Sequence, residues 1–325
     1  MQSKQMSLSV VIPVFNSEQN LPVLVDRLER ACHIFGEFEV LLVNDHSKDD
    51  SWPVIQQLAK EHWWVRGFSL MRNYGQHNAL LCGIRAARHE IVVTMDDDLQ
   101  NPPEEISQLL QKLSEGYDVV YGYPRKETHG FLRDLASNVT KIVLQSSMGV
   151  ESARHVSAFR AFQTKIRDAF CEYRGPFVSI DVLLTWGASR FAAIPVRNDP
   201  RAMGASNYTV GKLVTHAVNM MTGFSTLPLQ MASVTGFVAA IFGLGVLFFV
   251  LVRYVITGSS VPGFPFLACV VSIFAGTQLF ALGIIGEYLA RVHFRVMNKP
   301  SYTVQYSTDS VSSPLSQPIG HEQGR

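Results

Sequence analysis

Three consecutive aspartates follow a short apolar run in residues 91–98, which read IVVTMDDD. Four of the five residues before the triplet are apolar, which is typical of a strand buried on both faces. Carboxylates packed together raise one another's pKa unless a cation compensates them. Mg²⁺ or Mn²⁺ does so with oxygen ligands, often while carrying substrate phosphates. The triplet therefore indicates a divalent metal site, with a solvated acidic turn as the alternative.

The elements around the aspartates must position them, and residues 7–200 alternate between strand and helix patterns. Such alternation predicts an α/β fold with a doubly wound, mostly parallel sheet, whose ligands bind at the carboxyl ends of the strands. We assign this domain to residues 1–204. The expected strands are 8–14, 39–43, 65–70, 91–95 and 118–122, and the expected helices are 21–35, 51–61, 78–87 and one that begins at the Pro102-Pro103 pair.

Polar residues follow four of these strands at the point where each strand ends. They are Asn16 and Glu18 after the first strand, residues 44–47 after the second, residues 72–76 after the third, and the aspartates with Gln100 after the fourth. We expect them to meet at one edge of the sheet. Neither GxGxxG nor GxxxxGK[ST] occurs, so neither a dinucleotide-binding site nor a P-loop is indicated.

The length, net charge and cysteine content limit the number of domains and the kinds of binding site that are expected. A length of 325 residues suggests two domains at most, and a net charge of +1 gives no indication of nucleic-acid binding. The four cysteines are scattered, which predicts neither a disulfide framework nor a zinc site. No signal peptide is expected at the start, where a polar stretch runs directly into the first strand.

Two charge-free stretches dominate the C-terminal part. Residues 213–252 and 254–286 contain no Asp, Glu, Lys or Arg. Residues 231–254, in which Arg253 is the only charged residue, and residues 264–286 are each long enough to cross the hydrocarbon core of a bilayer, about 30 Å thick. They predict a two-span transmembrane hairpin, with a pair of buried core helices as the alternative. Residues 205–230 are predicted to form an amphipathic helix at the membrane interface.

The charges that flank the hairpin predict its orientation. Lys212 precedes the spans and Arg291, Arg295 and Lys299 follow them, whereas the connection contains only Arg253. This bias predicts a multi-pass membrane protein, which we expect in the inner membrane, with its N-terminal domain and its C-terminal tail, residues 287–325, in the cytoplasm. The end of the tail, from residue 307, is rich in Ser, Pro, Gln and Gly and is expected to be disordered.

Several strings resemble a known family. VVIPVFN, LLVNDHS, RNYGQHNA and TMDDDLQNPPEE are similar to family 2 glycosyltransferases of the GT-A fold, and the hairpin followed by GEYLARV resembles their polyprenyl-phosphate branch. That branch includes dolichyl-phosphate mannose synthases, bactoprenol glucosyltransferases and undecaprenyl-phosphate aminoarabinose transferases. The likeness covers most of residues 8–300. It implies metal-dependent, inverting transfer of a sugar from a nucleotide sugar, expected to be UDP-linked, to undecaprenyl phosphate, for cell-envelope glycan or lipid A modification.

The resemblance also implies roles for the donor-side residues. The family's DxD motif falls on Asp96 and Asp98, with Asp98 as the main ligand of Mg²⁺ or Mn²⁺, Gln100 assisting, and Asp96 at the ribose or the metal. Asp97 would be a bystander. Asp45 would read the nucleotide base, unless it is a turn or helix-capping acid. The remaining residues expected to contact the donor are Pro13, Phe15, Glu18 and Arg72.

The acceptor side matches the family less closely. Arg201, in a segment similar to R-x-x-G-x-S-K-Y, and Arg160 would bind the acceptor phosphate, although Asn207 replaces the usual lysine. No aspartate stands where relatives carry a candidate base, and His155 or Glu151 could replace it. A phosphomonoester has a second pKa of about 6 and is already mostly ionised at neutral pH, so a strong base is not required.

Two other functions stay open at this point. The first is an enzyme of the same fold that glycosylates another lipid or a growing glycan, although no QxxRW string occurs. The second is a catalytically weak membrane scaffold. The expected partners are the nucleotide sugar, the polyprenyl phosphate and membrane lipid, without nucleic acid. A homo-oligomer, for example a tetramer, is left open.

Overall fold

The computed structural model describes residues 6–125, 155–175, 178–199, 227–257, 263–297 and 299–311. The chain divides into two compact units. The first comprises residues 1–134, 144–208 and 300–325, and the second comprises residues 135–143 and 209–299. We describe the first unit as the catalytic domain and the second as the hairpin unit, each by itself.

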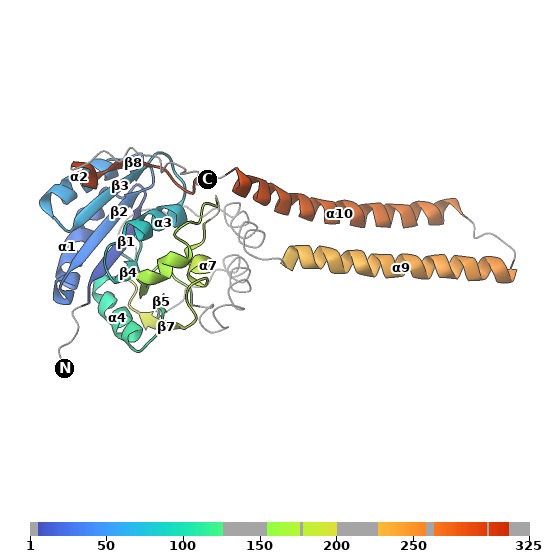
Figure 1. Cartoon of the computed structure of the whole chain (residues 1–325), viewed down its shortest axis with the longest axis horizontal. Helices are drawn as coiled ribbons and strands as arrows, with labels where there is room; N and C mark the ends of the chain where they lie inside the picture. The colour runs from blue at the N-terminus through green and yellow to red at the C-terminus, as the bar shows by residue number, and fades with distance from the viewer. Residues whose placement is uncertain are drawn as a thin grey trace, which may run out of the picture. The chain divides into compact units, whose positions relative to one another are not determined.

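The catalytic domain is built on a twisted α/β sheet (Figure 1). In the described part of the chain this sheet has eight strands in the order β7-β5-β6-β4-β1-β2-β3-β8. Strands β4, β1, β2 and β3 are parallel to one another, as are β5 and β7, whereas β6 and β8 run antiparallel to their neighbours. The bounds are β1 Leu8–Val14, β2 Phe38–Asn44, β3 Val65–Leu70, β4 Ile91–Thr94, β5 Val119–Pro124, β6 Arg160–Gln163, β7 Phe191–Val196 and β8 Val304–Ser307.

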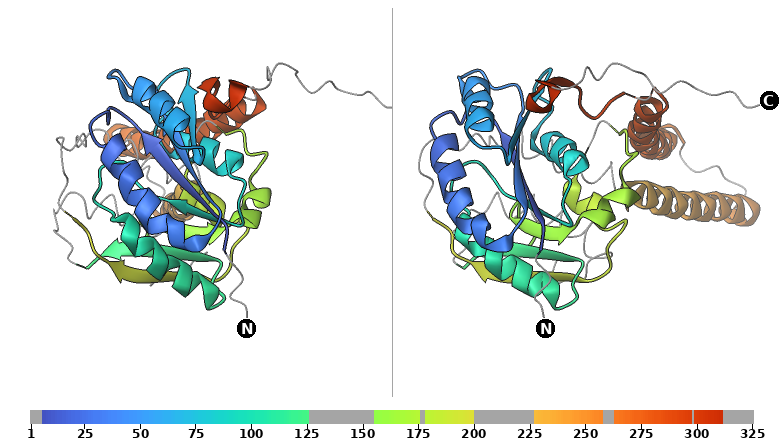
Figure 2. Two further views of the ribbon diagram at one scale, coloured as in Figure 1. Left: turned by 90° about the vertical axis from the view of Figure 1, so that its left-hand side faces the viewer. Right: turned by 60° about the vertical axis from the view of Figure 1, so that its left-hand side comes forward.

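Helices cover both faces of this sheet (Figure 2). Leu8, Val10 and Ile12 of β1 share one apolar core with helices α1, α2 and α4, whereas Val11 faces α3. Successive strand side chains point to opposite faces, which explains why each parallel strand is apolar throughout. The helices are α1 Leu21–Cys32, α2 Ser51–Glu61, α3 Gln76–Ala86, α4 Ile106–Ser114 and α7 Ile180–Leu184, with 3-10 turns at His33–Phe35, Pro103–Glu105 and Thr164–Ala169.

A glycine lets helix α3 lie close to the sheet. A Cβ atom on Gly83 would stand 2.3 Å from Cγ1 of Val11 and 3.1 Å from Cγ2 of Val43. Both distances are shorter than ordinary van der Waals contact, so only glycine permits this approach. Helix α3 begins at Gln76, just beyond the carboxyl end of β3, and its packing therefore fixes a helix start beside the ends of the parallel strands.

The predicted elements agree with the structure to within two residues for β1–β4, α2 and α3. One neighbour of β4 in the sheet is β6, a strand that was not predicted from the sequence. Strand β6 lies between β4 and β5 and is antiparallel to both, with Arg160 beside Thr94 and Tyr121. Its four residues lie far from β4 in sequence, and no local pattern separates so short a strand from a loop.

The C-terminal segment contains ordered structure beyond the predicted second span. Helix α10 continues to Val296, whereas that span was predicted to end at residue 286. Residues 304–311, mostly placed in the disordered tail, form β8 and the 3-10 turn Thr308–Val311. Strand β8 pairs with β3 and covers an edge of the sheet. We call residues 299–311 the C-terminal strap.

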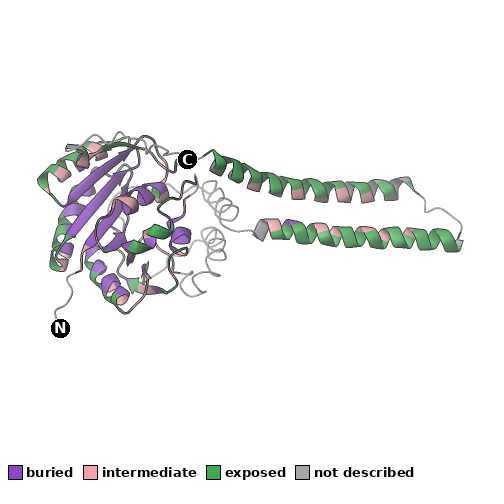
Figure 3. Ribbon diagram, viewed as in Figure 1, coloured by how far each residue is buried: buried purple, intermediate pink, exposed green. Residues whose placement is uncertain are grey.

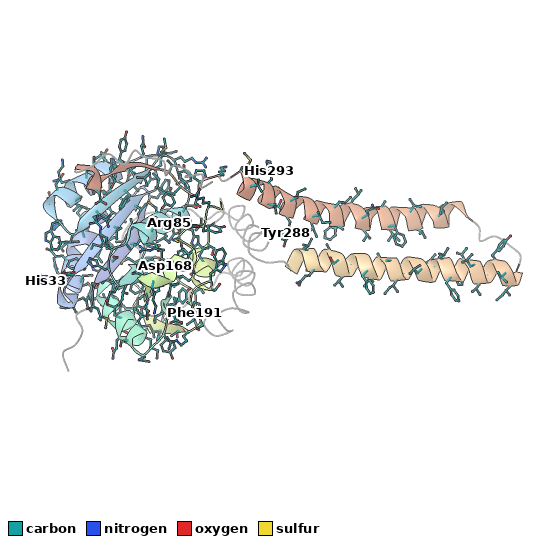
Figure 4. All side chains as sticks on the ribbon, viewed as in Figure 1. His33, Arg85, Asp168, Phe191, Tyr288 and His293 are labelled. Atoms are coloured by element: carbon teal, nitrogen blue, oxygen red, sulfur yellow. The ribbon has the colours of Figure 1, made fainter. Side chains whose placement is uncertain are left out.

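Buried charge anchors this strap. The Arg66 guanidinium, buried in β3, bonds Oε2 of Glu39 at 2.7 Å and both carboxylate oxygens of Asp309. Beside it, the backbone N–H of Gly67 donates to Oγ1 of Thr308 at 2.8 Å. At the start of the strap, the Tyr302 ring lies 5.6 Å from the guanidinium of Arg85, which is labelled in Figure 4. Composition predicted disorder because it does not show these distant partners.

We expect Asp309→Asn to lower the free energy of unfolding of the catalytic domain by about 1–2 kcal/mol at pH 7. Hydrogen bonds from Arg66 hold the pKa of Asp309 below its usual value. The stabilisation is therefore complete above the unfolded-state pKa of about 3.9 and is lost as the pH falls through the lower folded-state pKa. Thermal unfolding in detergent should show a difference from wild type that is constant at pH 5–8 and shrinks below about pH 4.

Asp26→Asn is the matched control, because Asp26 pairs with Arg30 on an exposed helix face. Such surface pairs contribute about 0.5 kcal/mol or less. Equal losses in the two variants would show that Asp309 does not anchor the strap.

The described residues of the hairpin unit form two long apolar helices in contact with each other, α9 Leu227–Thr257 and α10 Phe264–Val296. The stretches 229–256 and 273–290 are long and apolar enough to cross a membrane, and none of their most apolar windows is buried by protein. Figure 3 shows exposed residues along both helices. Apolar side chains without protein cover suit lipid rather than a protein core, so the alternative of two buried core helices is not supported.

Candidate active site

A cavity of about 270 Å³ opens at the carboxyl ends of the parallel strands. Strands β1, β2 and β3 end in register, since Val14 pairs with Asn44 and Asn44 pairs with Ser69. The loops that follow these strands and β4 therefore meet at one edge of the sheet. The cavity is lined by Pro13, Val14, Phe15, Asp45, Asn73, Gly75, Gln76, Asp96, Asp97 and Asp98.

Two of the three aspartates are held by neutral donors. The side-chain amide of Gln76 donates to Oδ1 of Asp96 at 2.6 Å. The backbone N–H of Gln100 donates to Oδ1 of Asp98 at 3.1 Å. Neither donor carries a positive charge, so these two bonds orient the carboxylates without neutralising them. Both carboxylates line the cavity.

Asp97 has a different environment. Its Oδ2 accepts the backbone N–H of Phe15 at 3.1 Å, which ties the start of the β1–α1 loop to the loop after β4. Burial raises the pKa of Asp97, and the charge of Asp98 adds to that rise, while hydrogen bonds from Ser17 and Phe15 oppose it. The middle aspartate is therefore not a bystander. It fixes the loop that presents Phe15 to the cavity.

The remaining pair fits a hard divalent cation. Mg²⁺ and related ions in proteins are usually held by one or two carboxylates together with substrate phosphates. Asp96 and Asp98 supply two carboxylates at the cavity, both oriented by donors. In the described residues no group of three or more His, Cys, Asp or Glu side chains could hold a metal without substrate. The donor set thus suits a cation that arrives with a phosphate ligand.

Asp45 lies at the end of β2 with both carboxylate oxygens engaged. Oδ1 accepts the backbone N–H of Tyr74 and Oδ2 accepts that of Gly75, each at 2.7 Å. Burial raises the pKa of Asp45, and these two hydrogen bonds oppose the rise. Each carboxylate oxygen has a second lone pair, so Asp45 can organise the β3–α3 loop and still accept a hydrogen bond from a ligand.

Unusual backbone geometry gathers around the same edge. The non-glycine residues of the described chain with positive φ are Asn16, His46 and Leu99, at +54°, +56° and +62°. Each follows a strand end that faces the cavity. Asn16 is held there by Ser47, whose Oγ accepts its N–H at 3.0 Å, and by Lys48, whose N–H donates to its Oδ1 at 2.8 Å. Strained backbone of this kind clusters at functional sites, where the surrounding structure maintains it.

Comparison with known proteins agrees with this geometry. The family model described as glycosyl transferase family 2 matches residues 9–170. Undecaprenyl-phosphate 4-deoxy-4-formamido-L-arabinose transferase from Enterobacter sp. (strain 638) is 35% identical over 314 residues, covering 94% of this chain and 95% of that protein. The chain belongs to glycosyltransferase family 2.

Two solved structures of other proteins are similar to the structure of this family 2 enzyme. Glucosyl-3-phosphoglycerate synthase from Mycobacterium tuberculosis, in complex with Mn²⁺, uridine diphosphate and phosphoglyceric acid, matches with a TM-score of 0.50 at 19% identity, over 67% of this chain and 76% of that chain. Mannosyl-3-phosphoglycerate synthase from Rubrobacter xylanophilus matches with a TM-score of 0.49 at 15% identity, over 66% and 72%. The first likeness, with the strand order, confirms the expected GT-A fold.

The structure separates the predicted donor-side residues of this glycosyltransferase into two groups. Those that line the cavity are Pro13, Phe15, Asp45, Asp96 and Asp98. Glu18, Arg72 and Gln100 do not line it. Glu18 joins two loops instead, because its Oε2 accepts the N–H of Asp50 at 2.9 Å. The Arg72 guanidinium lies 4.5 Å from the centre of the Tyr74 ring.

Arg160, expected at the acceptor phosphate, is placed differently. It is only 1% exposed and forms an ion pair with Asp181. Its Nε donates to Oγ1 of Thr94 at 3.1 Å, and Oδ1 of the same Asp181 accepts the hydroxyl of Tyr121 at 3.1 Å. The arginine supports the end of β4 from inside the domain, and its charge is already paired. This burial and pairing favour a structural role for Arg160, and its predicted role in binding the acceptor phosphate stays a prediction.

Among the other predicted acceptor-side residues, the structure describes His155. The His155 ring stacks on Tyr123, with ring centres 4.0 Å apart, and its buried Nδ1 has no hydrogen-bond partner among the described residues. Arg201, Asn207 and Glu151 lie outside the described residues, as does most of the predicted interfacial helix at 205–230.

The sequence interpretation missed three cavity residues of the β3–α3 loop. Asn73, Gly75 and Gln76 line the cavity, and Gln76 contacts Asp96 directly. A signal for them existed, since residues 72–76 were recognised as a polar stretch after a strand. That stretch carries no charge pattern that would distinguish Gln76 from its polar neighbours.

Proposed function

We propose that this family 2 glycosyltransferase transfers a sugar from a nucleotide sugar to undecaprenyl phosphate and forms a polyprenyl-phosphate sugar. One observation carries the proposal. The likeness to the Enterobacter transferase, which is named for undecaprenyl phosphate, extends over 94% of this chain and so includes both apolar helices. The product would serve cell-envelope glycan synthesis or lipid A modification.

On the donor side, Pro13 and Phe15 would contact the nucleoside, and Asp45 would accept a hydrogen bond from the base. Asp98 and Asp96, with Gln100 nearby, would hold Mg²⁺ or Mn²⁺. When bound, the cation neutralises the charge that develops on the leaving pyrophosphate. The protein's own contribution is to orient both carboxylates at the cavity through neutral donors.

On the acceptor side, the phosphate of the polyprenyl phosphate would attack the anomeric carbon in a single displacement, which inverts the configuration. Because that phosphate is mostly ionised at neutral pH, positioning matters more than proton removal. We assign the positioning to Arg201 and keep His155 as the candidate base. The dependence of the rate on acceptor concentration in Arg201→Ala and His155→Ala variants tests these two roles.

We propose that the catalytic domain and the C-terminus lie in the cytoplasm, because the flanking positive charges lie mostly outside the connection between the two spans. Single cysteines in an otherwise cysteine-free protein provide the measurement. A cysteine at position 259, between the two spans, should react with a membrane-impermeant maleimide added to intact cells. A cysteine at position 312 should react only after the membrane is opened. The reverse pattern would contradict the proposed orientation.

The function itself is tested by a transfer assay. Purified full-length protein with Mn²⁺, undecaprenyl phosphate and a panel of radiolabelled nucleotide sugars should yield a chloroform-soluble product with one of the donors. Transfer only to a glycan or another lipid would favour the alternative acceptor. No transfer from any donor, in protein that binds no nucleotide, would favour a scaffold.

A further inference from the structure

The loop between β3 and α3, residues 71–76, contacts two of the three carboxylates that the proposed function uses, Asp45 and Asp96. At its centre, the N–H groups of Tyr74 and Gly75 donate to the two oxygens of Asp45. At its end, Gln76 donates to Asp96. Asp45 and Asp96 follow different strands and are 51 positions apart in the chain. This loop therefore links the end of β2 to the end of β4.

The contact to Asp96 suits a metal-binding carboxylate. Gln76 is the first residue of α3, which packs against the sheet, so its backbone is held in place. Its amide donates at 2.6 Å without bringing a charge. A lysine at position 76 would neutralise Asp96 and compete with a cation, whereas a carboxylate at position 76 would repel the carboxylate of Asp96. Glutamine orients one oxygen without adding a charge.

Gly75 gives the loop its shape. Its φ is +94°, a conformation that residues with a side chain rarely adopt, and a Cβ atom there would meet nothing within 4 Å. The same residue donates to Asp45, and its carbonyl accepts the N–H groups of Asn78 and Ala79 at 3.0 and 3.1 Å. Glycine is thus required by backbone conformation and not by lack of space.

The opposite end of the loop is also fixed. The N–H of Met71 donates to the carbonyl of Thr303 in the C-terminal strap at 3.0 Å. Asn78 adds a further restraint, because its side-chain amide donates to the carbonyl of Tyr74 at 2.5 Å. The loop is therefore held at both ends and in the middle, and it can transmit a fixed geometry to the two carboxylates.

We infer that residues 71–76 are a positioning element that holds Asp45 and Asp96 in a fixed relation, with Gln76 as the positioning residue of Asp96 and Gly75 as the residue that sets the turn. The inference rests on the proposed function, because it takes these carboxylates to serve a nucleotide and a divalent cation. It adds residues for which the sequence interpretation gave no individual role.

Gln76→Met tests the contact to Asp96, because methionine keeps the length of the side chain and removes the donor. We expect Mn²⁺ to bind about tenfold more weakly, measured by electron paramagnetic resonance on the full-length protein in detergent with saturating UDP. The Mn²⁺ concentration for half-maximal transfer should rise equally, with kcat at saturating metal within about threefold of wild type. UDP binding without metal should not change.

Gln57→Met is the matched control, since Gln57 also donates to a carboxylate, that of Glu61 at 2.8 Å, on an exposed helix face. It should leave Mn²⁺ binding unchanged. Wild-type Mn²⁺ affinity in the Gln76 variant would overturn the inference. Failure of the wild type to bind UDP with Mn²⁺ would instead count against the proposed function, so the two failures are distinguishable.

Gly75→Ala tests the role of the turn, and Gly116→Ala is the matched control. Gly116 has a similar φ of +101°, and the nearest atom to an added Cβ is a movable arginine nitrogen at 3.4 Å. Both variants should lose a few degrees of melting temperature through backbone strain. Only Gly75→Ala should weaken UDP binding in titration calorimetry, by about tenfold, as the loop relaxes away from Asp45. Equal weakening in both variants, or in neither, would contradict the proposed positioning.

Discussion

Asp98→Asn is expected to reduce the rate of sugar transfer to undecaprenyl phosphate by about 1000-fold at saturating donor. The change removes one of the two carboxylate charges assigned to the cation, those of Asp96 and Asp98, while keeping the size of the side chain and an oxygen that can accept the N–H of Gln100. Asp96 and Asp98 would hold the cation together with the pyrophosphate, and the variant keeps only one of these two carboxylates, so the cation should bind more weakly. With less cation bound, less of the charge that develops on the leaving group would be neutralised.

The measurement is the initial rate of formation of chloroform-soluble product over a titration of Mn²⁺. Asp97→Asn is the internal control, because its amide oxygen can still accept the N–H of Phe15, and Asp97 has a structural role. We expect that variant to keep the rate within about fivefold of wild type. Equal rates for Asp98→Asn and wild type would contradict the proposed metal site, and a larger loss at Asp97 would exchange the two roles.

The triplet also shows how far sequence can reach. Residues 91–98 predict a buried strand ending in carboxylates, and the structure contains both. The division of roles within the triplet was only partly predictable. Asp97 was predicted to be a bystander, and the sequence did not show that it would accept a hydrogen bond from Phe15, 82 positions earlier. The loop that a side chain contacts is determined by the tertiary structure and cannot be read from the neighbouring sequence.

The same limit explains the other differences. Strands β1–β4 and helices α2 and α3 were predictable because their signals are local: apolar runs, prolines and glycines. Strand β6 and the C-terminal strap are stabilised by residues that are distant in sequence. Arg160 of β6 pairs with Thr94 and Tyr121 in the sheet, and Asp309 of the strap forms an ion pair with Arg66. Gln76 was missed for the same reason, because its importance comes from Asp96 and not from its own neighbours in sequence.

Arg160→Met is expected to destabilise the catalytic domain by about 3–5 kcal/mol. Methionine removes the charge that compensates Asp181, and a buried carboxylate then loses its cation while remaining out of water. Arg160 is 1% exposed and Asp181 is 7% exposed, so solvent cannot substitute for the lost partner. Thermal unfolding in detergent, followed by tryptophan fluorescence, should show a melting temperature lower than wild type by about 10 °C or more.

The double variant with methionine at 160 and leucine at 181 decides what Arg160 does. Replacing both partners of a buried pair by apolar residues is far less costly than removing one, so most of the lost stability should return. Recovery should be incomplete, because the hydroxyl of Tyr121 then loses its acceptor. If Arg160 only supports the end of β4, the recovered protein should have an ordinary KM for undecaprenyl phosphate. A stable double variant with that KM raised tenfold or more, about 1.4 kcal/mol of lost binding, would restore Arg160 to the acceptor site.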